Sequence, residues 1–302
     1  MGSEDGGTMC TFKIRNATNG DIPAINGLFK GEYGLGYPYL MTHLPADQIN
    51  LVAERSGRIV GFARAAPYGV YAHVWELCSL VVESDARKLG IARAFTVERI
   101  ERLRRMGVKT LVSEAVTCYE DCASQRNLHN FGFKPYGLLP FVHPWIRPEV
   151  LGDQPLSLLL MVANLNGGTG FGSRELFLER GDMDALTLIT EPGTLVPPWQ
   201  ARISTNIDPL VKNGKLVHGI RGADFVDIPL NHLSAIEHRH SLRAQGYRFA
   251  ALLPGFTRDT SEPLDFLRVY RPPRYDLTFD LVHVTPNLEP LKHYCQEEFI
   301  TP

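Results

Sequence analysis

The sequence predicts an α/β (α+β) fold built in two related parts, and three observations support this prediction. The apolar strand 74–83 runs into a glycine-containing turn and then into an amphipathic helix at 91–106. Segments with the two-residue period of strands alternate with segments of helical period along residues 11–165. The segment 128–140 is echoed by 242–254, which indicates a repeated unit.

Local signals justify the elements of the first part in order. Asp21 can cap the first helix, in which Ile25 and Leu28 share one face. Ser56-Gly57 is a turn pair between two apolar runs, which favours a hairpin. The elements expected are a strand at 11–15, a helix at 21–29, a loop or broken helix at 31–45, paired strands at 50–54 and 58–65, the strand 74–83, a helix at 91–106 ended by Gly107, a strand at 109–116, a helix at 121–130, and strands at 133–142 and 156–165.

The turn that follows the apolar strand carries the pattern Arg-x-x-Gly-x-Ala, from Arg87 to Ala92. The first main-chain N–H groups of a helix have no partner within it, and the helix dipole favours an anion there. Gly90 lets a phosphate approach the backbone closely, while Arg87 and Lys88 add positive charge. The turn therefore predicts an anion site.

This pattern resembles motif A of the GNAT superfamily of acyl-coenzyme A N-acyltransferases, in which the turn binds the pyrophosphate of coenzyme A. The segment 113–133, where a helix ends in Gly-Phe before a strand, resembles motif B of the same family. The resemblance implies a GNAT fold for residues 11–165, with a mixed, mostly antiparallel sheet whose central parallel strands are splayed apart.

The resemblance also implies where the acyl donor binds. The pantetheine arm of acetyl-coenzyme A, or of another acyl-CoA, would lie like an extra strand in the gap between strands 77–82 and 109–116. The cofactor-binding residues expected are Leu80, Val81 and Val82 for the pantetheine, and Arg87, Lys88, Leu89, Gly90, Ile91 and Ala92 for the pyrophosphate.

Transfer of an acyl group to an amine needs a base, and Glu76 is the candidate. It lies in an otherwise apolar strand, where desolvation would raise its pKa, and its place before Arg87 resembles that of the base in histone-type GNAT acetyltransferases. Glu114, on the adjacent strand, is a second acid that could face the same cavity or bind the substrate amine. Either glutamate could instead be a structural residue, exposed or paired.

The general acid is harder to assign. Many family members carry a tyrosine four residues before the glycine of motif B, where it protonates the leaving thiolate, but here that position is Leu128. Tyr119 and Ser124 are the candidate substitutes, ahead of Cys122, which also fits a small buried apolar role. The departure leaves open a sensor that binds coenzyme A without turning it over.

The acceptor is expected to be the primary amine of a small molecule, attacked directly in a ternary complex. Tyr33, Tyr37 and Tyr39, in the loop 31–45, would wall its site. Acidic residues near the cavity favour a cationic amine. The expected activity is therefore that of an acyl-CoA-dependent N-acyltransferase, with a carrier protein or an aminoacyl-tRNA as alternative donors.

The second part is expected to be a degenerate GNAT-like domain at 173–302 that covers or shapes the acceptor side, after a glycine-rich linker at 164–172. It lacks the Arg-x-x-Gly pattern before its helix, so no second cofactor site is expected. Its expected elements are a strand at 224–229, a helix at 233–245, a late strand at 274–285 and a terminal helix at 286–299.

Composition limits the remaining possibilities. The formal net charge of -2 argues against nucleic acid as a partner, and the basic run 99–105 is expected to be the solvated face of a helix. No apolar run approaches the ~20 residues that a membrane-spanning helix needs. Residues 1–10 are polar and are expected to be disordered rather than a signal peptide.

Cysteine and histidine spacing adds little chemistry. The 5 cysteines are scattered, which favours free thiols and a cytoplasmic location over a disulfide framework. His238 and His240 have no third ligand at a recognisable spacing, so no metal site is expected. Coenzyme A and an amine are the expected partners, together with a possible second copy in a homodimer.

Overall fold

The computed structural model divides the chain into two compact units, described separately below. The first comprises Met1–Ala66 and Leu77–Leu103, and the second comprises Pro67–Glu76 and Arg104–Pro302. The expected disordered segment 1–10 and most of the expected linker lie outside the described residues, and the domain limits 11–165 and 173–302 stay a prediction. The residues described are 12–69, 71, 73–143, 148–152, 154–165, 176–189, 211–212, 224–231, 233–256, 264–272 and 278–300.

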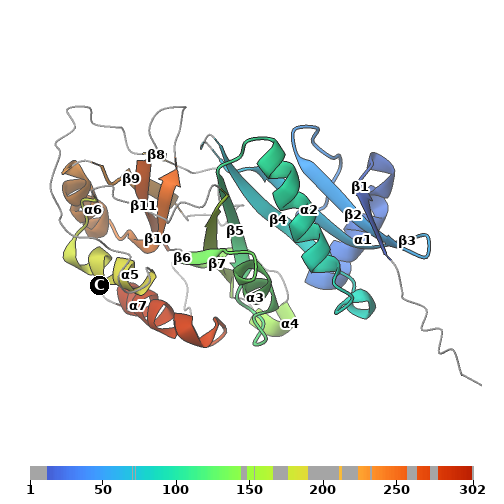
Figure 1. Cartoon of the computed structure of the whole chain (residues 1–302). Coiled ribbons are helices and arrows are strands. Elements are labelled where there is room, and N and C mark those ends of the chain that lie inside the picture. The colour runs from blue at the N-terminus through green and yellow to red at the C-terminus, as the bar shows by residue number, and fades with distance from the viewer. Residues whose placement is uncertain are drawn as a thin grey trace, which may run out of the picture. The chain divides into compact units, whose positions relative to one another are not determined.

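The first unit is an antiparallel sheet with helices on its two faces (Figure 1). Its β2–β3 hairpin turns at Ser56 and Gly57, both with positive φ, as the sequence predicts. The elements that lie wholly or partly in this unit are β1 (Lys13–Asn16), η1 (Asn19–Asp21), α1 (Ile22–Tyr33), β2 (Ile49–Arg55), β3 (Arg58–Pro67), β4 (Val74–Val82), η2 (Ser84–Ala86) and α2 (Ile91–Arg105).

Helices α1 and α2 pack against opposite faces of this sheet. Phe29 of α1 lies against Phe62 of β3, with ring centroids 5.8 Å apart. Gly61, the preceding residue, faces the other side, where a Cβ atom would lie 3.0 Å from the ring of Phe95 in α2. Glycine at this position therefore lets α2 approach the sheet closely.

A buried arginine fixes α2 to the strands. Arg99 is 1% exposed, and its guanidinium donates to the carbonyl oxygens of Arg64 (2.9 Å) and Cys78 (3.3 Å), on β3 and β4. Burial lowers the pKa of Arg99 to about 10. The expectation that residues 99–105 form a solvated basic face is therefore wrong at Arg99.

The second unit is a larger, mostly antiparallel sheet with the strand order β5-β7-β6-β10-β11-β9-β8. The first residues of β4 add a parallel ladder of three pairs, from Val74↔Thr110 to Glu76↔Val112. The remaining elements are β5 (Thr110–Val116), α3 (Ala123–His129), β6 (Lys134–His143), α4 (Pro148–Leu151), β7 (Leu156–Asn164), α5 (Arg180–Ile189), β8 (Val211–Lys212), β9 (Asp224–Pro229), α6 (Ser234–Ala244), β10 (Arg248–Phe256), β11 (Leu264–Arg271), η3 (Pro286–Leu288) and α7 (Glu289–Ile300).

Two four-element segments of this unit match in detail. In each, a strand is followed by a helix and two antiparallel strands: β5-α3-β6-β7, with the short helix α4 between β6 and β7, and β9-α6-β10-β11. The helices end alike. Gly132 and Gly246 both have positive φ, and the N–H group of each donates to the carbonyl oxygen three residues earlier at 3.0 Å. Register shifts follow Pro135 in β6 and Phe249 in β10, which are equivalent positions.

The match extends to side chains and to the seam between the two segments. Ser157 accepts a hydrogen bond from the N–H of Phe141 (2.9 Å), and its equivalent Asp265 accepts one from Gly255 (2.8 Å). Strands β6 and β10 pair at Gly137↔Ala251, which occupy the same position of the repeat. Equivalent residues face each other in this way when a two-fold axis relates two copies.

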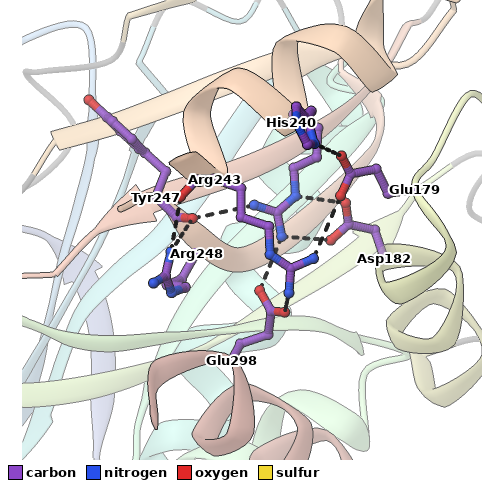
Figure 2. Close-up of polar contacts among 8 residues, drawn as sticks. Glu179, Asp182, His240, Arg243, Tyr247, Arg248 and Glu298 are labelled. Atoms are coloured by element: carbon purple, nitrogen blue, oxygen red, sulfur yellow. Dashed lines mark hydrogen bonds and ion pairs between the residues drawn. The ribbon is translucent and has the colours of Figure 1, made fainter. Parts of the chain in front are cut away.

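Helices α5, α6 and α7 lie beside the second segment and share a buried ion cluster (Figures 1 and 2). Arg239 of α6 binds Asp182 of α5 through two hydrogen bonds, of 2.8 and 3.0 Å, and Glu298 of α7 through one of 3.1 Å. Arg243 also binds Glu298, at 2.6 Å. The cluster joins three helices that are far apart in the sequence.

The late strand expected at 274–285 is wrong over 278–285, which form no strand; residues 274–277 lie outside the described residues, among which β11 is the last strand. The apolar run of β11 contains Arg268, which obscured its strand pattern. No helix of the described residues is long and apolar enough to cross a membrane. The same residues hold no group of three or more metal-ligating side chains.

Candidate active site

The turn between β4 and α2 has the backbone geometry that an anion site needs. Lys88 and Gly90 both have positive φ, of 62° and 85°. A Cβ atom on Gly90 would meet nothing within 4 Å, and Leu89 beside it is 38% exposed. The first N–H groups of α2, from Ile91 onward, therefore begin at an open, exposed turn.

The side chain of Arg87 turns away from this backbone. Its Nε donates to the carbonyl oxygen of Val82 (3.1 Å), and its guanidinium pairs with Glu32 of α1. That pair offsets part of the positive charge expected at the turn. Residues 88–90 of the turn are exposed, whereas the side chain of Ile91 is buried and Ala92 is half-buried.

Strand β4 is irregular just before the turn. Ser79 has a φ of 52°, which is rare for a residue other than glycine, and Cys78 before it accepts hydrogen bonds from Arg64 and Arg99. Residues 78–80 are half-buried rather than alternating between buried and exposed. An arginine supplied by α2 therefore satisfies a carbonyl group at the point where the regular strand geometry breaks.

Glu76 and Glu114 face the same side of the sheet in the second unit. Glu76 is level with Val112 in the parallel ladder, and Glu114 is two residues further along β5. Side chains two residues apart on a strand point the same way. The sequence prediction of two acids on one face is consistent with this register.

Glu114 is held by a tyrosine that sequence reasoning did not select. The hydroxyl group of Tyr68 donates to Glu114 Oε1 at 3.1 Å. Tyr68 follows β3, and its main-chain N–H donates to the carbonyl oxygen of Val74 at 2.9 Å, which fixes it beside the start of β4. Tyr68 is 1% exposed, so this hydrogen bond is shielded from water.

The second matching segment contributes the rest of a polar cluster in which Glu114 is half-buried and the other members are buried. Arg268 of β11 donates to the Tyr68 hydroxyl oxygen (2.6 Å) and binds Asp227 of β9 with two hydrogen bonds of 2.8 Å. Tyr71 also donates to Asp227. We call Tyr68, Tyr71, Glu114, Asp227 and Arg268 the tyrosine–arginine cluster.

Burial sets the protonation of this cluster. Desolvation raises the pKa of Glu114, although Arg268 and the Tyr68 hydrogen bond oppose the rise. Desolvation also raises the pKa of Tyr68 well above its usual value, so its hydroxyl keeps its proton. Asp227 and Arg268 are charged residues within buried strands, the same signal that singled out Glu76.

The candidate acids lie at the start of α3. Ser124 is half-buried, and no hydrogen bond among the described residues joins it to Glu114. Gln125 beside it is buried and binds residues 283 and 285, which anchors this end of the helix. Leu128, at the position where the family has tyrosine, is 4% exposed and packs in the core. The roles of Tyr119 and Ser124 stay predictions.

The three tyrosines expected at the acceptor site form one aromatic group in the first unit. The rings of Tyr33 and Tyr37 stack at 5.0 Å, and Tyr37 meets Tyr39 edge-on at 5.6 Å. Burial raises the pKa of Tyr37 to about 12. The side chain of Asn26 fixes the loop by two hydrogen bonds to the main chain of Met41.

Comparison with known proteins places part of the chain in a family. Residues 24–133 match the model of the acetyltransferase (GNAT) family. No curated protein matches the sequence. Among solved structures, a ribosomal-protein-alanine N-acetyltransferase from Brucella melitensis is 28% identical, with a TM-score of 0.41, over 50% of this chain and 99% of that chain.

Two further structures show a similar extent of match. An N-acetyltransferase from Staphylococcus aureus Mu50 is 23% identical over 51% of this chain and 99% of its own, with a TM-score of 0.41. The ribosomal-protein-S18-alanine N-acetyltransferase of Escherichia coli is 16% identical over 53% and 97%, with a TM-score of 0.43. From the family match, residues 24–133 of this chain form a domain of the GNAT acetyltransferase family.

Proposed function

We propose that the chain is an acyl-CoA-dependent N-acyltransferase that moves an acetyl or other acyl group to the primary amine of a small molecule. The observation that carries this proposal is the family match over residues 24–133, which contains both the anion turn and Glu114. Solved relatives from Salmonella typhimurium and Sinorhizobium meliloti are described as complexes with acetyl-CoA.

Acyl-CoA fits the residues at the anion turn. The main-chain N–H groups of Leu89, Gly90, Ile91 and Ala92 would hold the pyrophosphate, with Lys88 adding positive charge and Arg87 contributing once released from Glu32. The open space around Gly90 supports this assignment, because a phosphate needs close approach to the backbone. The main chain of Leu80, Val81 and Val82 would hold the pantetheine arm, which carries the reactive thioester.

The acceptor amine must lose a proton before its nitrogen attacks the thioester carbonyl. Glu76 and Glu114 are the carboxylates proposed for this step, and the contacts favour Glu114, whose raised pKa suits a base working near neutral pH. Glu114 is half-buried, so its carboxylate can also attract an ammonium group without complete desolvation of the pair, which supports a cationic acceptor. Tyr119 or Ser124 would return a proton to the departing thiolate.

A glycine variant tests the donor site. Gly90→Arg would fill the turn with a side chain, and we expect it to weaken binding of acetyl-CoA at least tenfold by calorimetry. Gly57→Arg is the matched control, since Gly57 also has positive φ (75°) and open space within 4 Å of the position that a Cβ would take, but lies in the β2–β3 turn. Equal loss in both variants, or loss in neither, would contradict the assignment.

Burial of Leu128 favours one second candidate, a coenzyme A sensor without turnover. Release of free thiol from acetyl-CoA, measured over a panel of primary amines, separates the two. Amine-dependent release supports the enzyme. Tight binding of acetyl-CoA without release on any amine supports the sensor.

We also propose that β9-α6-β10-β11 is a degenerate copy of β5-α3-β6-β7. The equivalent Gly137 and Ala251 at the seam support it, as do the matching helix ends and strand irregularities. On this proposal the second segment pairs with the first through β6 and β10, in the place that a second chain would take in a homodimer. The homodimer expected from the sequence is then not needed to cover this strand edge.

A further inference from the structure

The hydroxyl group of Tyr68 joins the two halves of the tyrosine–arginine cluster. It donates to Glu114 of the first matching segment and accepts from Arg268 of the second. Because Arg268 occupies an acceptor position of the phenol oxygen, the single hydroxyl proton is directed to Glu114. This arrangement links the reactive carboxylate to a charge that lies far away in the sequence.

The register of the sheet explains how such distant residues meet. One row of paired residues crosses five neighbouring strand pairs, and paired residues share a face. Glu114 lies at one end, and the ion pair lies at the other. The row consists of Glu114, Leu160, Gly137, Ala251, Arg268 and Asp227.

Side-chain packing holds the connecting tyrosine in place. The Tyr68 ring meets Phe256 of β10 at 6.1 Å, and the Arg268 guanidinium carbon lies 5.5 Å from its centre. Tyr71, in the same segment, packs against Phe266 at 5.4 Å. Tyr68 and Tyr71, which follow β3, therefore pack against the side chains of β10 and β11 in the second matching segment.

Asp227 fixes the direction of the arginine. Its two carboxylate oxygens accept hydrogen bonds from Nε and Nη2 of Arg268. The remaining nitrogen, Nη1, then donates to the hydroxyl oxygen of Tyr68. Arg268 is 2% exposed and Asp227 is fully buried, so water does not screen the pair. Tyr71 gives Asp227 a further hydrogen bond.

We propose that Arg268, oriented by Asp227, is a positioning residue that acts through Tyr68 to hold Glu114 as an ionised base. This inference rests on the proposed acyltransferase function and extends it, because the second half then contributes to catalysis rather than only to the shape of the acceptor site. The residue acts through Tyr68 and makes no hydrogen bond of its own to Glu114 among the described contacts.

The electrostatics give the direction of the effect. Arg268 and Tyr68 both lower the pKa of Glu114 against the rise that burial causes. Glu76 acts on Tyr68, while Asp227 and Tyr71 act on Arg268. Without the arginine charge, Glu114 would keep its proton to a higher pH, so less of the base would be ionised at a given pH.

The test compares Arg268→Gln and Tyr68→Phe with Arg271→Gln, an exposed arginine near the end of the same strand. Two readouts are needed: the pH profile of kcat/KM, and the titration of the Glu114 carboxyl group by NMR in glutamate-labelled protein. In both test variants we expect the acidic limb and the titration to move up by about one pH unit or more. At a pH below the acidic limbs of both the parent and the variant profile, kcat/KM of the variant should be about tenfold lower for each pH unit by which its limb has moved. The control should leave both readouts unchanged.

The outcomes separate this inference from the proposed function. A folded Arg268→Gln variant with an unshifted Glu114 titration overturns the inference, whatever its activity. A shifted titration in a protein that releases no thiol supports the link between Arg268 and Glu114 while the proposed function fails. If Arg268→Gln does not fold, Tyr68→Phe, which keeps the ring contacts, decides by the same criteria.

Discussion

Replacing Arg239 by methionine should destabilise the second unit strongly. The side chain is 1% exposed and makes every described polar contact of Asp182, which is equally buried. Glu298 would keep its hydrogen bond to Arg243, so Asp182 is the carboxylate that would lose its partner. Removing one partner of a buried ion pair costs about 3–5 kcal/mol, which is a large part of the stability of a typical domain.

Unfolding in urea, followed by circular dichroism, measures this loss as a lower midpoint with an unchanged slope. If the two units unfold in separate steps, the loss should appear only in the step of the second unit. Arg271→Met is the control: Arg271 is exposed, and its guanidinium carbon lies 5.3 Å from the centre of the Tyr247 ring, a contact worth about 0.5–1 kcal/mol, so a much smaller loss is expected.

A double variant checks the physical reason. In Arg239→Met with Asp182→Leu no charge remains without its partner at this position, and apolar replacements of buried ion pairs are often neutral or stabilising. The double variant should therefore recover most of the loss. A single-variant loss under about 1 kcal/mol, or a double variant no more stable than the single one, would show that the unpaired Asp182 charge is not the cause of the loss.

Three further substitutions give testable results. Gly137→Ala places a Cβ atom 2.2 Å from the carbonyl oxygen of Ala250, so the β6–β10 seam must shift, and urea unfolding should show a loss of about 1–3 kcal/mol. Gly61→Ala pushes on Phe95 and hence on α2, so the KM for acetyl-CoA should rise more than kcat falls; an unchanged KM would contradict this. Because burial raises the pKa of Tyr37 to about 12, its contribution to stability is complete below pH ~10 and is lost as pH rises to about 12. Tyr37→Phe should therefore lose less stability over this alkaline range than the parent protein, as thermal melting at each pH would show.

The parts of the fold that the sequence predicted are those governed by local patterns. The turn at Gly90 and the helix α2 follow from a glycine, a cluster of basic residues and helical spacing, all within one short segment. The similarity between the two segments was visible because Gly132 and Gly246 follow the helices α3 and α6 at matching positions. Such features depend on neighbours in the chain and survive without knowledge of tertiary structure.

The parts that were missed depend on tertiary packing. Arg99 was read as part of an exposed basic run, because helical spacing does not reveal that one arginine reaches back to carbonyl groups on β3 and β4. Tyr68 was not selected because its partner Arg268 lies in another segment of the chain. Arg268 also hid the strand pattern of β11, since a charge in a buried strand departs from the expected apolar run.

The comparison of the two copies limits the number of donor sites. In the first copy, β5 has the parallel strand β4 at its edge, whereas the equivalent β9 has the antiparallel β8. The row of paired residues makes Asp227 the equivalent of Glu114 and Arg268 the equivalent of Leu160. Because Leu160 is neutral, only the second segment carries a charged pair at these positions. Among its described residues, the proposed second copy thus has no parallel pair like that of β4 and β5, and it carries a charged pair that reaches Glu114 through Tyr68. We therefore expect calorimetry to find one acetyl-CoA bound per chain, with Gly90→Arg removing it. Two sites per chain, or one that survives this substitution, would contradict the division of roles between the copies.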